Sequence, residues 1–277
     1  MLPKLIVQLQ PPVAVYLALA GSNMLDYLQI TLMLSPLELT VSTAVVFVAG
    51  MVRGFAGFGL SALVMAGLAL IIPPVSLIPV CFLLEGTASM IMIRGGFKNA
   101  DRKIAYGLAI GSAIGVPFGL LTTLNVSVDT SRLLALSLIL VLAFLQLFNK
   151  SPAFLATRPG LYITGLIAGF ATGIASVGGM VVALYVLAQN APATRMRASL
   201  VLFLFLGLFT SAIWLSLSGM LDALAVKRAV FLAPVVIAGV LTGSYLFRPS
   251  LEGLYKRFCL VLLIGLAVTG LLRQLQG

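Results

Sequence analysis

Long apolar stretches separated by short polar loops make up most of the chain. Eight of these stretches approach or exceed the roughly 20 helical residues that cross a hydrocarbon core. They run over residues 41–72, 75–93, 104–124, 133–148, 161–187, 199–217, 229–247 and 258–272. None of them alternates apolar and polar residues as the strands of a membrane barrel do. The pattern therefore predicts an all-α, polytopic membrane protein, because helices satisfy their own backbone inside lipid.

The composition supports this prediction. Of the 277 residues, 61% are hydrophobic and 9% are charged, whereas soluble domains contain about 25% charged residues. The formal net charge of +10 would favour nucleic acid as a partner of a soluble protein, but the basic residues lie mainly in short loops, as the positive-inside rule describes. We therefore expect membrane lipid, and not nucleic acid, as a partner. The densest basic cluster holds Arg94, Lys98, Arg102 and Lys103, and we place this loop in the cytoplasm.

The residue types that most metal and catalytic sites need are missing or isolated. The chain has no histidine, and its two cysteines, Cys81 and Cys259, lie inside apolar segments, where we expect them to be small core residues. We therefore expect no metal and no other cofactor. An intramembrane protease would need a histidine or lysine base beside its serine, or two embedded aspartates. The sequence favours neither arrangement, so we do not expect an enzyme.

The first 38 residues are interrupted by polar positions and prolines. Pro11 and Pro12 break the apolar core that a signal peptide needs, and Asn23, Asp26 and Gln29 follow at spacings of three. This spacing places the three polar residues on one face of a helix, which predicts an amphipathic segment at the membrane interface or against the bundle. A signal peptide and a true transmembrane span stay open as alternatives.

An internal repeat organises the rest of the chain. Residues 50–65 align with residues 165–180, and the alignment pairs glycine with glycine at several positions. Membrane transporters are often built from two such repeats, with the substrate held between them. We divide the chain into an N-terminal segment, a first repeat, a linker and a second repeat, which cover residues 1–38, 39–148, 149–160 and 161–277.

The relative orientation of the two repeats depends on the glycine-rich segment in each of them. If that segment crosses the membrane once as a broken helix, the repeats are parallel. If it forms a re-entrant hairpin, the repeats are inverted. The distribution of basic residues between the loops favours the inverted arrangement slightly.

Two interpretations fit the glycine clusters of the repeats. The glycines could allow close helix packing of the small-xxx-small kind. They could instead interrupt a helix, which leaves unpaired backbone N–H groups whose partial positive charge attracts an anion, with serine and threonine hydroxyls as further donors. Two facing interruptions would form an anion site near the membrane midplane. Its candidate residues are Gly54, Gly57, Phe58, Gly59, Ser61, Thr172, Gly173, Ser176, Gly178 and Gly179.

Two charged residues lie deep inside apolar segments, where a charge is costly. Arg53 directly precedes the first glycine cluster, and Ala168 stands at the equivalent place in the second repeat. Arg53 could reach an interface or pair with an acid for structure alone, or it could bind the charge of the substrate. Glu85 could be the ion-pair partner of Arg53, or a protonatable group that couples proton movement to transport.

The duplicated glycine pattern resembles that of a known family. Residues 53–74, RGFAGFGLSALVMAGLALIIPP, and residues 169–200 carry the pattern in register. From about Leu39 to the C-terminus the chain resembles the TauE/SafE sulfite-exporter family of anion transporters. The resemblance extends to the glycines of both clusters and to Ser199, which follows the second. The chain departs from the family's triple glycine, with FGL at 58–60 and GGM at 178–180.

The resemblance implies a multi-pass secondary transporter of the bacterial inner membrane that moves a small sulfur-containing anion such as sulfite, a sulfonate or thiosulfate. We expect export by alternating access, linked to the proton-motive force, with Arg53 and the glycine clusters holding the anion and Glu85 coupling protonation to movement. A passive anion channel and a transporter of a small carboxylate are the alternatives. A homodimer stays open as the oligomeric state.

Overall fold

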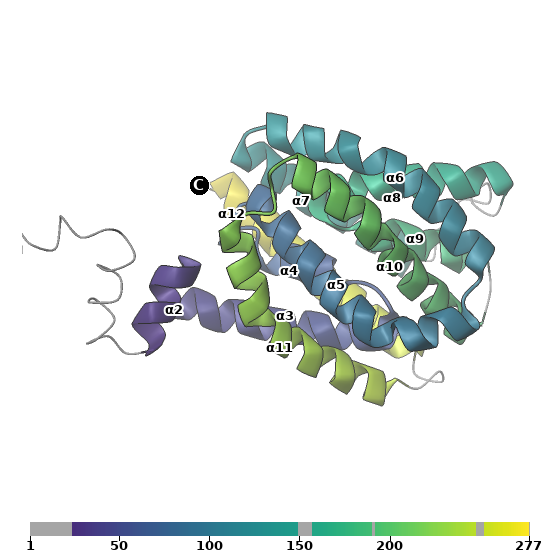
Figure 1. The fold of residues 1–277 in the computed structure, drawn as a ribbon, viewed down its shortest axis with the longest axis horizontal. Helices are drawn as coiled ribbons and strands as arrows, with labels where there is room; N and C mark the ends of the chain where they lie inside the picture. Colours follow the sequence, from purple (N-terminus) through teal and green to yellow (C-terminus); the bar gives the residue numbers. More distant parts are fainter. Residues whose placement is uncertain (1–23, 149–156, 190–191, 248–251, 277) are drawn as a thin grey trace, which may run out of the picture. The chain divides into compact units, whose positions relative to one another are not determined.

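The structure, a computed structural model, describes residues 24–148, 157–189, 192–247 and 252–276, and within them the regular structure is entirely α-helical. Figure 1 shows these helices in chain order. The chain divides into two compact units, Met1–Val41 and Ser42–Gly277. The helices are α2 (Met24–Leu32), α3 (Pro36–Ala56), α4 (Leu60–Leu68), α5 (Pro74–Asn99), α6 (Arg102–Asn125), α7 (Val128–Leu147), α8 (Arg158–Ala175), α9 (Gly178–Ala188), α10 (Ala193–Leu217), α11 (Ala223–Leu246) and α12 (Glu252–Gln276).

The first unit contains α2 and the first turn of α3. The start of α3 is fixed by a reciprocal cap: the Ser35 N–H donates to Glu38 Oε2 at 2.8 Å, and the Glu38 N–H donates to Ser35 Oγ at 3.3 Å. This capping box satisfies two N–H groups that a helix start leaves unpaired. Helix α2 covers Asp26 and Gln29 of the expected amphipathic segment, while residues 1–23 lie outside the described residues and the interfacial position of the segment stays a prediction.

The chain is a polytopic membrane protein, as the hydrophobic pattern predicts. Among the described residues, seven helices are long and apolar enough to cross a membrane, and the shorter apolar stretch Pro159–Ala175 adds to them. The two longest apolar segments of the sequence, 41–72 and 161–187, each form two helices separated by a short interruption: α3 and α4 in the first half, α8 and α9 in the second. Most of the predicted linker, residues 149–156, lies outside the described residues.

In the second unit, helices from the first half of the chain pack on helices from the second half. Each half has the same order of elements, a helix interrupted once and then three long helices. Helix α6 of the first half packs along α8 of the second, α10 packs on both α5 and α6, α11 packs on α5, and α12 packs on α7. The core that forms between these helices surrounds both interruptions. The parallel or inverted orientation of the halves stays a prediction.

Glycines allow α6 and α8 to touch backbone to backbone. A Cβ added at Gly111 would lie 2.6 Å from the carbonyl oxygen of Tyr162, and one added at Gly169 would collide with the backbone of Ser112. In the first half, a Cβ at Gly54 would likewise collide with the carbonyl oxygen of Val240 on α11. Close packing of small residues, one of the two interpretations of the glycine clusters, therefore holds for these positions.

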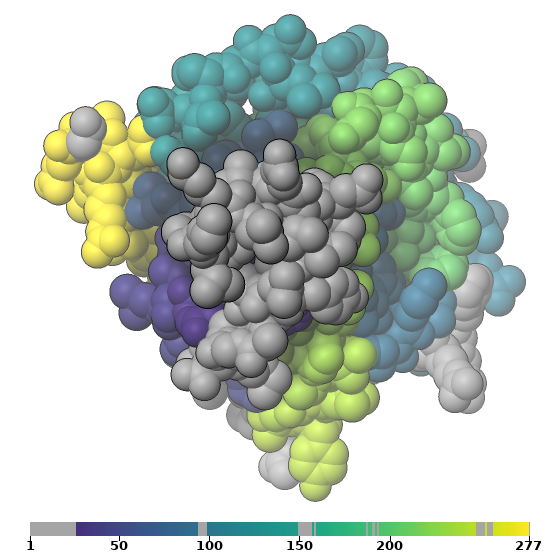
Figure 2. Space-filling model, turned by 60° about the vertical axis from the view of Figure 1, so that its left-hand side comes forward, coloured from purple at the N-terminus to yellow at the C-terminus, as the bar shows by residue number. Residues whose placement is uncertain are grey.

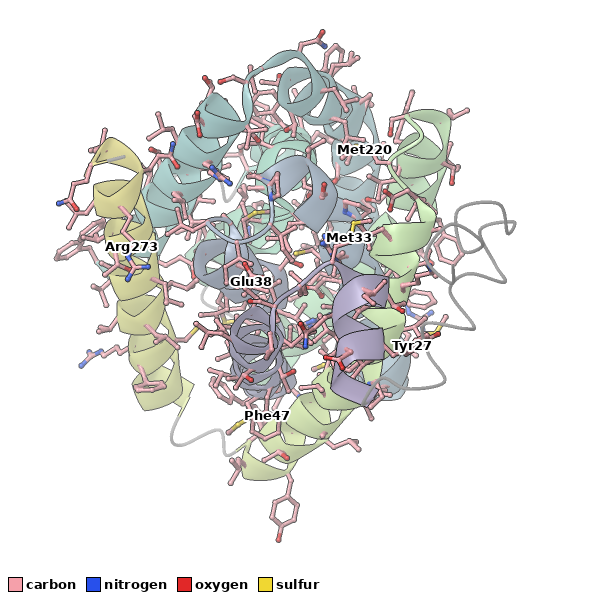
Figure 3. The ribbon with its side chains drawn as sticks, turned by 90° about the vertical axis from the view of Figure 1, so that its left-hand side faces the viewer. Tyr27, Met33, Glu38, Phe47, Met220 and Arg273 are labelled. Atoms are coloured by element: carbon pink, nitrogen blue, oxygen red, sulfur yellow. The ribbon has the colours of Figure 1, made fainter. Side chains whose placement is uncertain are left out.

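The faces of the long helices that point away from these contacts are apolar. On α6, Ile110, Ile114, Phe118 and Leu121 are more than half exposed, away from the glycines that contact α8. Figure 2 shows α12, in yellow, at the edge of the surface, and Figure 3 shows its side chains projecting outward along its length, with Arg273 in the last turn. Large exposed apolar faces are costly in water but suit a bilayer, where the surrounding tails are as apolar as the side chains.

Candidate functional site

The first interruption lies between α3 and α4 and consists of Gly57, Phe58 and Gly59. Gly57 has φ 82° and Gly59 has φ 95°, a left-handed backbone region that costs other L-residues about 1–2 kcal/mol. Two glycines at these positions therefore let the chain leave α3 and start α4 within three residues. Phe58 between them is buried.

Arg53 and Glu85 form a buried ion pair beside this interruption. The Arg53 side chain is fully buried, and its Nε donates to Glu85 Oε2 at 2.9 Å. Its terminal nitrogens donate to the carbonyl oxygen of Gly57 and, at 3.0 Å, to Ser89 Oγ. The other carboxylate oxygen of Glu85 accepts from both the N–H (3.3 Å) and the hydroxyl (3.0 Å) of Ser61. This network fastens α3, the start of α4 and α5 together, and it satisfies both charges, as burial requires.

A second arginine, which the sequence analysis did not single out, also binds the end of α3. Arg197 on α10 donates to the carbonyl oxygen of Gly54 and, at 3.3 Å, to Ser244 Oγ. Its guanidinium carbon lies 4.6 Å from the centroid of the Phe247 ring, within the range of a cation–π interaction. Two arginines thus neutralise the partial negative charge that the C-terminal carbonyls of a helix carry.

The second interruption lies between α8 and α9. Ser176 ends α8 with φ 59°, and its N–H donates to the carbonyl oxygen of Thr172 at 2.8 Å. Helix α9 starts at Gly178, where an added Cβ would collide with Thr172 Oγ1 and with the carbonyl oxygen of Ala168. The N–H groups of Gly178 and Gly179 belong to the first turn of α9, which has no partners for them within the helix.

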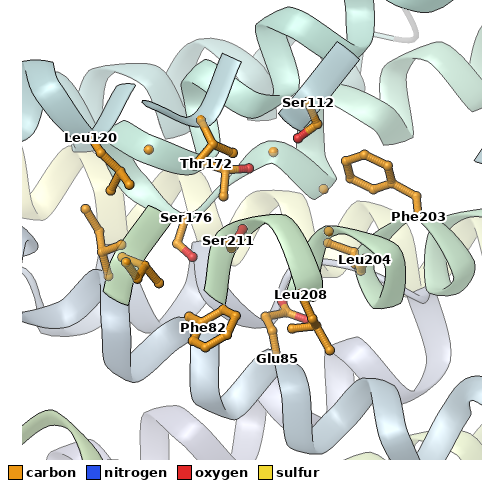
Figure 4. A pocket seen from close by; sticks show the side chains of 17 residues that line it. Phe82, Glu85, Ser112, Leu120, Thr172, Ser176, Phe203, Leu204, Leu208 and Ser211 are labelled. Carbon is orange, nitrogen blue, oxygen red and sulfur yellow. The ribbon is translucent and has the colours of Figure 1, made fainter. Parts of the chain in front are cut away.

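A cavity of about 50 Å³ opens beside this second interruption. A site needs roughly 10–15 Å³ to hold one water, so the cavity has room for a few waters or one small oxyanion. In Figure 4, Ser112 and Thr172 line one side, Ser176 and Ser211 lie centrally, and Phe82 and Glu85 lie on the opposite side. The lining residues are Ile78, Phe82, Glu85, Ser112, Val116, Leu120, Thr172, Gly173, Ser176, Gly178, Gly179, Phe203, Leu204, Gly207, Leu208, Ser211 and Leu215.

The cavity brings together half of the predicted site. Thr172, Gly173, Ser176, Gly178 and Gly179 line it, and so does Glu85. The sequence analysis missed two further hydroxyls of the lining, on α6 and α10, because a single serine in an apolar helix gives no spacing signal. These are Ser112 and Ser211.

Apart from Glu85, the first-half residues of the predicted site do not line the cavity. The described lining contains no basic side chain, and Arg53 and Ser61 bind the two carboxylate oxygens of Glu85, through which they connect to the cavity. Gly57 and Gly59 form the interruption itself, and Gly54 packs on α11. Phe58 joins the two interruptions, since a Cβ added at Gly179 would lie 3.7 Å from the Cβ of Phe58.

Ser199, which the family resemblance adds to the site, lies elsewhere. Its hydroxyl oxygen accepts from the Asp101 N–H at 2.9 Å, and it lines a separate pocket with Asp101, Gln189 and Arg195. The structure therefore places Ser199 at one end of α10 and not in the cavity beside the second interruption.

Comparison with known proteins gives one match. The model of the family described as Sulfite exporter TauE/SafE matches residues 42–270, which include both interruptions and all residues of the cavity. No curated protein and no solved structure matches the chain significantly.

Proposed function

The chain belongs to the TauE/SafE sulfite exporter family, and from this premise we propose that it is a secondary transporter for a small sulfur-containing anion, of the sulfite, sulfonate or thiosulfate type. In this proposal the anion binds in the cavity beside the second interruption and crosses the bacterial inner membrane by alternating access. The family accounts for anion transport in a membrane; the substrate, the mechanism and the coupling are proposals.

The observation that carries the proposed site is the convergence of neutral donors on one small cavity. The hydroxyls of Ser112 and Ser211 and the start of α9 at Gly178 and Gly179 all border it. The Thr172 hydroxyl also borders it but donates its proton to the Ala168 carbonyl oxygen. Backbone N–H groups at a helix N-terminus, together with the helix dipole, favour an anion. A site made of neutral donors can also release its ligand, which a transporter must do and which a buried arginine contact would oppose.

Glu85 is the proposed coupling group because it borders the cavity while it holds the first interruption together. A negative carboxylate next to a bound anion is electrostatically unfavourable in a low-dielectric site. Binding of the anion and protonation of Glu85 therefore favour one another. Protonation would also weaken the ion pair with Arg53, which connects occupancy of the cavity to the packing of α3 against α5.

Thermal melts of the purified protein test the substrate class. We expect a concentration-dependent rise in melting temperature with sulfite, thiosulfate or a sulfonate that exceeds the rise with sulfate or simple carboxylates, since a ligand that binds the folded state stabilises it by mass action. A selective shift for a carboxylate would move the proposal to that substrate class.

Flux into proteoliposomes separates the transporter from the channel. A transporter saturates with substrate and accumulates it against a concentration gradient when a proton gradient is imposed. A flux that rises linearly and never exceeds equilibrium would support the passive anion channel and refute alternating access.

A further inference from the structure

A polar groove lies at the end of the molecule where α5 stops and α6 and α10 begin. It is open, encloses about 670 Å³, and is formed by two stretches that are far apart in the sequence. Its lining residues are Asn99, Ala100, Asp101, Arg102, Lys103, Pro192, Thr194 and Arg195. Both α6 and α10 present their N-terminal turns here, so two helix dipoles add positive potential to the groove.

The charge of the groove is unbalanced. Arg102, Lys103 and Arg195 are exposed, and none of them forms an ion pair or side-chain hydrogen bond with the described residues. The one acid of the lining, Asp101, uses its Oδ1 to accept the Ile104 N–H at 3.2 Å as the cap of α6. Three cations therefore share one groove with a single carboxylate, and they repel one another unless an anion joins them.

A smaller pocket of about 140 Å³ shares Asp101 and Arg195 with the groove and extends it inward to Gln189 and Ser199. The side-chain nitrogen of Gln189 is buried and has no hydrogen-bond partner among the described residues, a state that costs free energy unless a ligand or water accepts from it. The Ser199 oxygen accepts from the Asp101 N–H, which leaves the proton of the hydroxyl available to donate.

We propose that the groove and this pocket form a second anion site, separate from the cavity beside α9, for a tetrahedral oxyanion of the phosphate or sulfate kind. Arg195 supplies the charge at the boundary between groove and pocket. Gln189 and Ser199 supply neutral donors inside, and Arg102 and Lys103 draw the anion in from solvent. The proposal does not depend on which anion the transport cavity takes.

Two sources can supply this chemistry, a free oxyanion and the phosphate headgroup of an anionic lipid. Both would meet the same arginine fork and donors, because a guanidinium binds phosphate and sulfate oxygens alike. The concentration of free anion and the composition of the bilayer can be varied independently, so one experiment can separate the two sources.

The test uses the full-length protein in nanodiscs at constant ionic strength. In nanodiscs of phosphatidylcholine alone, inorganic sulfate is titrated and its apparent Kd is read from the shift in melting temperature. In the other arm, phosphatidylglycerol replaces part of the lipid without added sulfate. We expect stabilisation in at least one arm, and we expect Arg195→Gln to weaken it about tenfold, the loss that one charge-assisted hydrogen bond predicts.

Gln189→Leu keeps the volume of the pocket but removes its donor, and it should weaken binding by a smaller factor. The matched control is Lys227→Gln, which removes one positive charge from an exposed position on α11.

A sulfate response in phosphatidylcholine identifies a free oxyanion, and a response to phosphatidylglycerol alone identifies a lipid headgroup. The proposal is overturned if neither arm stabilises the protein, or if Lys227→Gln weakens the response as much as Arg195→Gln does. Thr172→Val, which alters the transport cavity, should leave this response unchanged, so failure here is distinct from failure of the transport proposal.

Discussion

The two interruptions occupy equivalent places in the chain but are bordered by different groups. At the first, between α3 and α4, side chains of the protein bind the exposed backbone groups. Arg53 and Arg197 donate to the carbonyl oxygens of Gly57 and Gly54 at the end of α3, and the Glu85 carboxylate accepts from the Ser61 N–H in the first turn of α4. At the second, between α8 and α9, hydroxyls and the start of a helix border a cavity of about 50 Å³. The first interruption is held by an ion pair and hydrogen bonds within the protein, and the second has the form of a binding site.

The two halves also differ at the residue that precedes each glycine cluster. Ala168 stands where Arg53 stands in the first half and is fully buried. In the proposed site, a long cation at that position would compete with the anion for the space beside α9. Under that proposal the first half contributes stability and the second half binds the ligand.

The largest expected effect comes from breaking the buried ion pair at the first interruption. Arg53→Met removes the partner of Glu85 and leaves a buried charge uncompensated, which costs about 3–5 kcal/mol. We expect a large fall in melting temperature in detergent, and we expect the double variant Arg53→Met/Glu85→Leu to recover most of it. A single variant as stable as the parent would show that the first interruption is not held by this pair.

An intermediate effect is expected from adding one methyl group to the second interruption. Gly178→Ala places a Cβ against Thr172 Oγ1 and the Ala168 carbonyl oxygen, so the start of α9 must shift, and overpacking of this kind costs about 1–3 kcal/mol. Anion affinity, measured by melting shifts, should fall by about tenfold.

The matched control lies on the other wall of the same cavity. Gly207 also lines the cavity, but a Cβ added there meets no atom within 4 Å. Gly207→Ala should therefore bind the anion nearly as the parent does. Equal losses in the two variants would mean that any added volume in the cavity matters and that the geometry at α9 has no special role.

The smallest expected effect comes from removing one hydroxyl in the cavity beside the second interruption. Ser211→Ala removes one hydroxyl of the lining, which we expect to weaken anion binding about fivefold, since one neutral hydrogen bond contributes about 1 kcal/mol. Ser216→Ala is the control, because Ser216 lies on the same helix but is exposed and does not line the cavity. Unchanged affinity in Ser211→Ala would remove this hydroxyl from the site.

The sequence pointed to the two glycine clusters and the two buried charges because each leaves a local signal, while it left open whether Arg53 pairs with Glu85 or binds the substrate. Glycine clusters stand out in apolar segments, and Arg53 and Glu85 are charges where lipid or protein would surround them. Arg197 left no such signal, since it lies near the start of α10 among other basic residues that the positive-inside rule explains. Ser112 and Ser211 could be assigned to the cavity only from the packing of α6 and α10 around it. The same packing places Ser199 in a separate pocket.

The contact between α6 and α8 limits how such a molecule can change shape. Where glycines bring two backbones into direct contact, no flexible side chains lie between them to absorb sliding, and a shift would have to carry one helix over the ridges of the other. The pair should therefore move as a rigid body, taking the wall formed by Ser112 and Thr172 with it. In the proposed alternating-access cycle, relative motion would then occur where α10 meets this body, at larger side chains such as Phe203 and Leu204. The displacement of α10 would open the cavity to one side and close it to the other.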